Sequence, residues 1–153
     1  MVPARGGSKG LPNKNILKFA NEPLISYTIN QANGSKYIDK LILSSEDEEI
    51  IGVAKSYDID IPFVRPMSLA GDSIPGIDVV LHAIKKIPGY DIIVVLQPTS
   101  PLRSAQDIDK AISIFIEKKS DSLKLSKKKP LSSENERGST SITSDMLNLL
   151  KVN

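Results

Sequence analysis

The stretch Asp91-Ile92-Ile93-Val94-Val95-Leu96-Gln97 is the clearest strand signal in the chain. Its centre is uninterrupted isoleucine, valine and leucine, the composition of a parallel strand that is buried on both faces. Residues 40–44 repeat this pattern, and residues 62–64 form a weaker third candidate. Apolar residues at helical spacing occupy the segments around these runs, at residues 23–33, 48–57, 77–87 and 105–118. This alternation predicts an α/β fold with a mostly parallel sheet.

The composition is that of one globular domain in a chain of 153 residues, with 40% hydrophobic and 25% charged residues. A net charge of +2 gives no basic surface of the size that nucleic acid requires, so we expect no nucleic-acid partner. No apolar run reaches the length of about 18 residues that a membrane span needs, so we expect no membrane-spanning segment. Because the chain has no cysteine, it suits a reducing compartment, and we expect a cytoplasmic protein.

The character of the sequence changes near residue 122, after which serine, lysine, glutamate and asparagine dominate. Such a segment has little to bury, and disorder is one expectation for it. We therefore predict a core at residues 1–122 and a divergent polar tail at residues 123–153. Within the tail, residues 146–150 form an amphipathic stretch that is too short to be stable alone.

A loop rich in glycine and basic residues lies near the start of the sequence: Arg5-Gly6-Gly7-Ser8-Lys9-Gly10-Leu11-Pro12-Asn13-Lys14-Asn15. Its glycines let backbone N–H groups turn toward an anion, and its cationic side chains can neutralise phosphate charge. The composition suits a triphosphate. The spacing matches neither the P-loop nor the dinucleotide-binding pattern. An ordinary solvated glycine turn is the alternative interpretation.

Two further segments follow predicted strands. Arg65 can offer a fork of donors to a base edge or a phosphate, while Asp72 and Ser73 can cap the next helix, a commoner role for such residues than metal binding. In the turn at residues 44–47, Ser45 is a candidate helix cap. His82, the single histidine, lies among apolar residues of a predicted helix, where a structural role is commoner than catalysis.

The strongest strand is followed by Gln97-Pro98-Thr99-Ser100-Pro101-Leu102-Arg103. Ligands of open parallel sheets bind beyond the carboxyl ends of the strands, which is where this loop lies. The amide of Gln97 and the hydroxyls of Thr99 and Ser100 could hydrogen-bond a polar ligand, and Arg103 could pair with a carboxylate. Taken alone, the loop could equally be a turn stiffened by its two prolines.

Residues 3–15 resemble the N-terminal signature of the N-acylneuraminate cytidylyltransferases, the CMP-sialic acid synthetases. Residues 65–82 and 97–103 are similar to later motifs of the same family, and the resemblance covers roughly residues 3–122. It implies a Rossmann-like, three-layer nucleotidyltransferase core. It also implies transfer of CMP from CTP to the anomeric hydroxyl of an acidic nine-carbon sugar, with release of pyrophosphate.

The resemblance assigns roles to individual residues. Arg5, Lys14 and Gln97 are expected to be catalytic. The expected nucleotide site consists of Arg5, Gly6, Gly7, Ser8, Lys9, Asn13, Lys14, Asn15, Arg65, Asp72 and Ser73. The expected sugar site consists of Gln97, Thr99, Ser100 and Arg103.

The family implies Mg²⁺ as cofactor, but no ligand for it is recognisable here, because the aspartates near and within the tail, Asp121 and Asp145, sit in no metal motif. The expected partners are CTP, an acidic sugar and a second subunit, although the family's dimerisation region is not recognisable in this sequence. Sialic, legionaminic and pseudaminic-type acceptors remain alternatives, as does a non-catalytic nucleotide-binding fragment.

Overall fold

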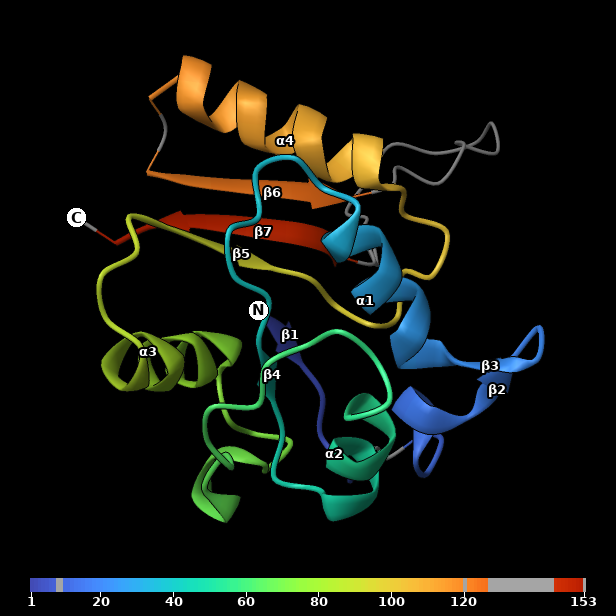
Figure 1. Cartoon of the computed structure of the whole chain (residues 1–153). Coiled ribbons are helices and arrows are strands. Elements are labelled where there is room, and N and C mark those ends of the chain that lie inside the picture. The colour runs from blue at the N-terminus through green and yellow to red at the C-terminus, as the bar shows by residue number, and fades with distance from the viewer. Residues whose placement is uncertain (8–9, 120, 127–144, 153) are drawn as a thin grey trace, which may run out of the picture.

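The computed structural model describes residues 1–7, 10–119, 121–126 and 145–152. Three short parallel strands form the middle of the molecule (Figure 1): β1 (Val2–Pro3), β4 (Leu43–Ser44) and β5 (Ile92–Val95). β1 pairs in parallel with β4, with Val2 opposite Leu43. The Met1 amino nitrogen donates to Val94 O at 2.6 Å, and Met1 O accepts from Leu96 N at 3.0 Å. These two bonds align β1 beside the end of β5 in the parallel sense.

Two strands from the region predicted to be a tail complete the sheet: β6 (Ser122–Ser126) and β7 (Asp145–Lys151). β7 lies between β5 and β6 and runs antiparallel to both, with Leu149 opposite Val94 on one side and Leu123 on the other. Residues 146–150 therefore belong to a central strand instead of standing alone. The predicted boundary after residue 122 falls within β6, while the expectation for residues 127–144 lies outside the described residues.

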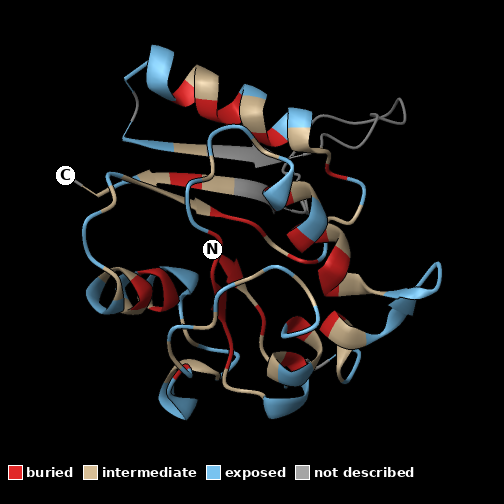
Figure 2. Cartoon of the chain, in the orientation of Figure 1, coloured by how far each residue is buried: buried red, intermediate tan, exposed pale blue. Residues whose placement is uncertain are grey.

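Helices cover both faces of this sheet (Figures 1 and 2). On one face lie α1 (Leu24–Asn33), α2 (Glu48–Ala54) and α4 (Ala105–Glu117). Their apolar residues pack on Val2, Leu43, Leu96 and Leu149. On the other face α3 (Gly76–Lys86) packs against Met1, Ile42 and Val95. Neighbouring residues of a strand thus pack into the cores on opposite faces of the sheet, because side chains alternate between the two faces along a strand. The predicted α/β, three-layer class is confirmed.

The helix predictions agree with the structure to within a few residues, and α4 begins with a capping box between Ser104 and Asp107. α2 is capped by Asp47, whose Oδ1 accepts from Ile50 N at 2.9 Å, so the prediction of Ser45 as the cap is wrong. α3 begins after Pro75 with no side-chain cap, so Asp72 and Ser73 do not cap it. The part of the chain that the structure describes contains no helix long and apolar enough to span a bilayer.

The weak strand predicted at residues 62–64 does not form. Only an isolated bridge between Ile42 and Asp60 joins this segment to β4. Pro62 has no N–H to donate, which breaks the ladder, and the chain meets β4 again only where Arg65 N donates to Ser45 O at 2.8 Å. The remaining elements are a hairpin and two short 3₁₀ helices: β2 (Lys18–Phe19), β3 (Glu22–Pro23), η1 (Lys14–Ile16) and η2 (Met67–Leu69).

Candidate functional site

A cleft of about 540 Å³ opens at the carboxyl ends of β1 and β5. Its lining comes from four parts of the chain. The segments that follow β1 and β5 contribute charged and amide side chains, the segment from residue 65 through α3 contributes an apolar wall, and β7 contributes two residues. The lining residues are Pro3, Arg5, Lys14, Asn15, Arg65, Leu69, Gly71, Asp72, Ile74, Gly76, Ile77, Val79, Val80, Val95, Gln97, Pro98, Thr99, Asn148 and Leu150.

The cleft brings together residues from all three segments that the sequence marks as chemical. The predicted site residues that line it are Arg5, Lys14, Asn15, Arg65, Asp72, Gln97 and Thr99. Six other described residues predicted for the site do not line it: Gly6, Gly7, Asn13, Ser73, Ser100 and Arg103. Ser8 and Lys9 lie outside the described residues. The fold thus collects about half of the predicted set at one place.

Arg5 joins the glycine loop to the segment before α3. Its Nη2 forms an ion pair with Asp72 Oδ1, and its Nη1 donates to Ala70 O at 3.5 Å. The backbone of Arg5 is held from the other side, because Asn15 Nδ2 donates to Arg5 O at 3.0 Å. Asn15 is buried, so it supports the loop from within. The Arg5 side chain is about one-third exposed and lines the cleft, with the Asp72 carboxylate beside its guanidinium.

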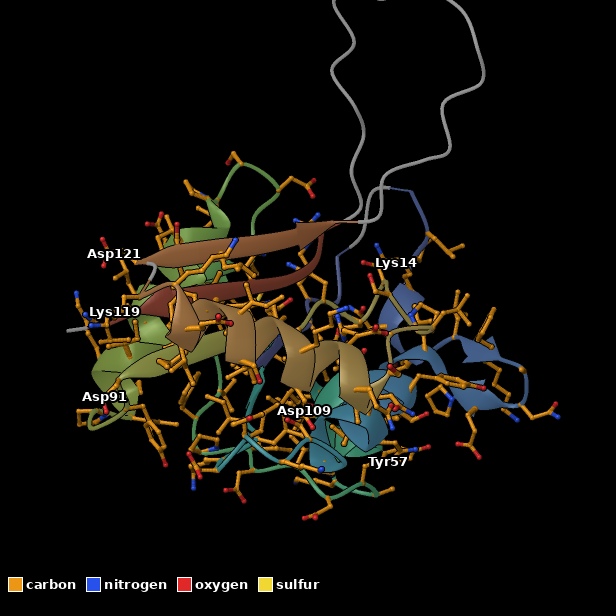
Figure 3. All side chains as sticks on the ribbon, turned by 90° about the horizontal axis from the view of Figure 1, so that it is seen from above. Lys14, Tyr57, Asp91, Asp109, Lys119 and Asp121 are labelled. Carbon is orange, nitrogen blue, oxygen red and sulfur yellow. The ribbon has the colours of Figure 1, made fainter. Side chains whose placement is uncertain are left out.

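Lys14 opens η1 and is a half-buried residue of the cleft lining. Asn13 precedes it with a φ of 52°, a left-handed conformation that asparagine tolerates, and its Nδ2 donates to Glu49 Oε2 at 3.2 Å. Figure 3 shows Lys14 on the side of the molecule that carries the β2–β3 hairpin, far from Asp121 at the opposite end of the sheet. Asp121 therefore lies away from this basic end of the cleft.

Arg65 borders the cleft, and two of its three guanidinium nitrogens, Nε and Nη2, contact other groups of the protein. Its Nε donates to Glu46 Oε2 at 3.0 Å, its Nη2 contacts the same oxygen, and Nη2 also donates to Ala4 O at 3.2 Å. The second oxygen of Glu46 accepts from Gly6 N at 2.9 Å. Glu46 was not among the residues predicted for the site, because a glutamate in a turn at a strand end does not reveal its buried partners in the sequence.

The loop after β5 divides into a part that faces the cleft and a part that lies beneath it. Gln97 and Thr99 line the cleft, whereas Arg103 is 1% exposed. Arg103 Nη2 donates to Thr28 Oγ1 at 3.1 Å and to Gln97 O at 3.3 Å. Burial lowers the pKa of Arg103 to about 10, which leaves the guanidinium ionised at neutral pH. The structure therefore places Arg103 behind Gln97, where it fixes the backbone of the loop instead of reaching into the cleft.

The family model of cytidylyltransferases matches residues 1–146. The chain belongs to the cytidylyltransferase family. The pseudaminic acid cytidylyltransferase of Campylobacter jejuni is 42% identical over 124 residues, covering 78% of this chain and 53% of that enzyme. The N-acylneuraminate cytidylyltransferase of Escherichia coli is 37% identical over 115 residues, covering 75% of this chain and 27% of that enzyme. The resemblance seen in the sequence is confirmed at the level of the family.

A solved cytidylyltransferase structure from Leptospira borgpetersenii serovar Hardjo-bovis superposes with a TM-score of 0.70 at 21% identity. The superposition covers 98% of this chain and 58% of that one. At this identity the likeness shows the fold alone, and it agrees with the three-layer core. The chain spans about half the length of the pseudaminic acid cytidylyltransferase that it matches.

Asn148 is a cleft residue that sequence analysis did not find. It lies on β7 opposite Val95 and is half-buried at the cleft. Its segment has no motif, and nothing in the polar sequence around it shows that it returns to the sheet beside β5. Only the antiparallel pairing of β7 brings this amide to the same edge as Gln97.

Among the described residues, one carboxylate lines the cleft, that of Asp72. Among them, no group of three or more histidine, aspartate or glutamate side chains is arranged to hold a metal ion. Asp72, the carboxylate at the cleft, is paired with Arg5. His82 does not line the cleft, and its ring centroid lies 5.0 Å from that of Phe63 in an edge-to-face contact. A structural role for His82 agrees with this position.

Proposed function

We propose that this chain forms the nucleotide-binding part of a cytidylyltransferase that transfers CMP from CTP to an acidic nine-carbon sugar and releases pyrophosphate. The observation that carries the proposal is the meeting of Arg5, Lys14 and Gln97 in one cleft at the carboxyl edge of the sheet. Open α/β sheets bind their ligands at this edge. The family match supports the same reaction type.

In the proposed complex, Arg5 and Lys14 bind the triphosphate. Their positive charges would draw electron density away from the α-phosphorus and stabilise the departing pyrophosphate. Phosphate oxygens would compete with Asp72 for the Arg5 guanidinium. The backbone N–H group of Gly7, with Ser8 and Lys9, completes the phosphate end of the proposal, and Gly6, whose N–H donates to Glu46 Oε1, shapes the loop around the phosphates.

The remaining predicted residues are proposed to hold the nucleoside and the acceptor. Arg65, Asp72, Ser73, Asn13 and Asn15 are assigned to the nucleotide half.

Gln97, Thr99 and Ser100 are assigned to the sugar. The oxygen of the anomeric hydroxyl attacks the α-phosphorus and an O–P bond forms. The bond from the α-phosphorus to the oxygen of the β-phosphate breaks, pyrophosphate leaves with that oxygen, and the hydroxyl proton passes to solvent. Arg103 acts indirectly, by fixing Gln97.

The acceptor is proposed only as a class, an acidic nine-carbon sugar. The matched relatives are named for pseudaminic acid and for N-acylneuraminate, so related sugars of this class are equal candidates. A panel of N-acylneuraminate, pseudaminic acid and legionaminic acid, each with CTP and Mg²⁺, tests the choice. The sugar that gives the highest rate of pyrophosphate release identifies the acceptor.

Titration calorimetry with CTP, UTP, ATP and GTP, followed by a pyrophosphate-release assay, tests the proposal as a whole. Selective binding of CTP and release of pyrophosphate are the expected results. Binding of CTP without release would favour a second candidate, a non-catalytic nucleotide-binding chain. Selective binding of another nucleotide would contradict both.

The setting of the protein is part of the same proposal. A chain without cysteine suits the reducing cytoplasm, and Mg²⁺ is proposed to arrive with the triphosphate. A homodimer is proposed from the family resemblance, and analytical ultracentrifugation measures it. A monomer at all concentrations would contradict the dimer.

Replacing Lys14 by alanine is expected to raise the Kd for CTP about tenfold, because a charge-assisted bond to phosphate contributes more than about 1.4 kcal/mol. Calorimetry measures the change. Lys18 supplies the matched control, since it carries the same charge nearby, is exposed on β2 and does not line the cleft. Equal Kd values for the two alanine variants would remove Lys14 from the phosphate site.

Replacing Gly6 by alanine is expected to weaken CTP binding about tenfold. A Cβ at this position would overlap the Asp47 carboxylate, 2.7 Å from Cγ, so the loop must shift. Asp47 cannot turn away freely because it caps α2.

Gly52 is the control. It lies on α2 and does not line the cleft, and a Cβ there would meet no atom within 4 Å, so its alanine variant should keep the wild-type Kd. A Gly6→Ala variant with unchanged CTP affinity would show that the position of this loop does not matter for binding.

A further inference from the structure

Glu46 is a carboxylate withdrawn from solvent next to the cleft. It lies directly beyond β4, and its side chain is 6% exposed. The side chain of its partner Arg65 is 3% exposed. Both charges are therefore almost completely desolvated, and each depends on the other for compensation.

The two oxygens of Glu46 hold two different parts of the site. Oε1 accepts from Gly6 N at 2.9 Å, and Oε2 accepts from Arg65 Nε at 3.0 Å. Arg65 closes the ring of contacts, because its Nη2 donates to Ala4 O at 3.2 Å. Residues 4–6 follow β1, Glu46 follows β4, and Arg65 ends the extended segment beside β4. The Glu46 side chain thus connects its own segment to the segments of Gly6 and Arg65, which are far apart in the sequence.

A contribution to stability alone accounts poorly for this arrangement. Because desolvation offsets the attraction, a buried ion pair contributes little net stability compared with apolar residues of the same volume. A carboxylate that spans a backbone N–H and a guanidinium does fix geometry, because both bonds are directional. The groups that it fixes are the glycine loop and a cation of the cleft lining.

We propose that Glu46 is a positioning residue for the nucleotide site, which holds the glycine loop and the Arg65 guanidinium at a set separation so that both meet the ligand together. The assignment rests on the proposed function. Glu46 itself lies outside the cleft lining and acts through its two partners.

The first test is Glu46→Gln, which keeps the shape of the side chain. In the variant, one of the two carboxylate oxygens is replaced by an NH₂ group, which then faces another donor, either Gly6 N–H or the Arg65 guanidinium. One of the two hydrogen bonds is lost, and the separation between the glycine loop and Arg65 is no longer fixed. The Kd for CTP is expected to rise about tenfold, which calorimetry measures well below the melting temperature, with circular dichroism to verify folding. The control is Glu48→Gln, the same change at an exposed residue of the first turn of α2, which should keep the wild-type Kd within about twofold.

The second test is Glu46→Asp, which retains a negative charge beside Arg65 and so avoids a lone buried cation. The shorter side chain cannot reach both partners, and the Kd for CTP is expected to rise at least about threefold. A folded Gln or Asp variant with the wild-type Kd and a lower melting temperature would overturn the assignment, since a merely structural residue changes only the melting temperature. Failure of the wild-type chain itself to bind CTP would overturn the proposed function together with this assignment, and the wild-type titration alone reports it.

Discussion

Replacing Leu149 by alanine is expected to lower the free energy of unfolding by about 3 kcal/mol. Leu149 is 0% exposed and lies in the middle of β7, between Val94 on β5 and Leu123 on β6. Its side chain belongs to the core beneath α1 and α4, so the truncation removes buried apolar surface and leaves a cavity. Denaturation in urea, followed by circular dichroism, measures the loss.

Lys151 provides the control for this prediction. It lies on the same strand but is exposed, so Lys151→Ala should change the unfolding free energy by no more than about 0.5 kcal/mol. An equally small effect of Leu149→Ala would mean that residues 145–151 do not pack into the sheet in solution. The experiment therefore decides directly whether β7 belongs to the folded core.

The parts of the fold that the sequence predicts are those whose apolar pattern is local. Residues 92–95 and the four main helices carry enough isoleucine, valine and leucine at strand or helix spacing to identify themselves. β7 does not, because Asn148 interrupts a short apolar run within a polar region. What makes this segment a strand is the pairing with β5 and β6 on its two sides, and a single sequence does not display such long-range pairing.

Some residues of the candidate site could likewise be predicted from the sequence, and others could not. Arg5 and Lys14 were predictable from the composition of the glycine loop and its resemblance to the family signature, and Gln97 from its place after a predicted parallel strand. The burial of a charge was not predictable. Arg103 has the sequence context of a ligand residue but lies 1% exposed behind Gln97, and Glu46 stands in a turn beside a candidate helix cap but bridges two segments. A charged residue reveals such a role only when its partners are known.

Replacing Arg103 by alanine is expected to lower the free energy of unfolding by about 3 kcal/mol, because it leaves a cavity and removes the donor to Thr28 Oγ1 and Gln97 O. Arg103→Met separates the two causes. Methionine keeps most of the stem volume and removes the desolvated charge, so its cost should be only about 1 kcal/mol. Urea denaturation measures both variants against Lys110→Ala, which truncates an exposed cation on α4. If Arg103→Ala costs no more than the Lys110 variant, Arg103 does not hold the loop from below, and its guanidinium would again be a candidate for direct contact with the sugar.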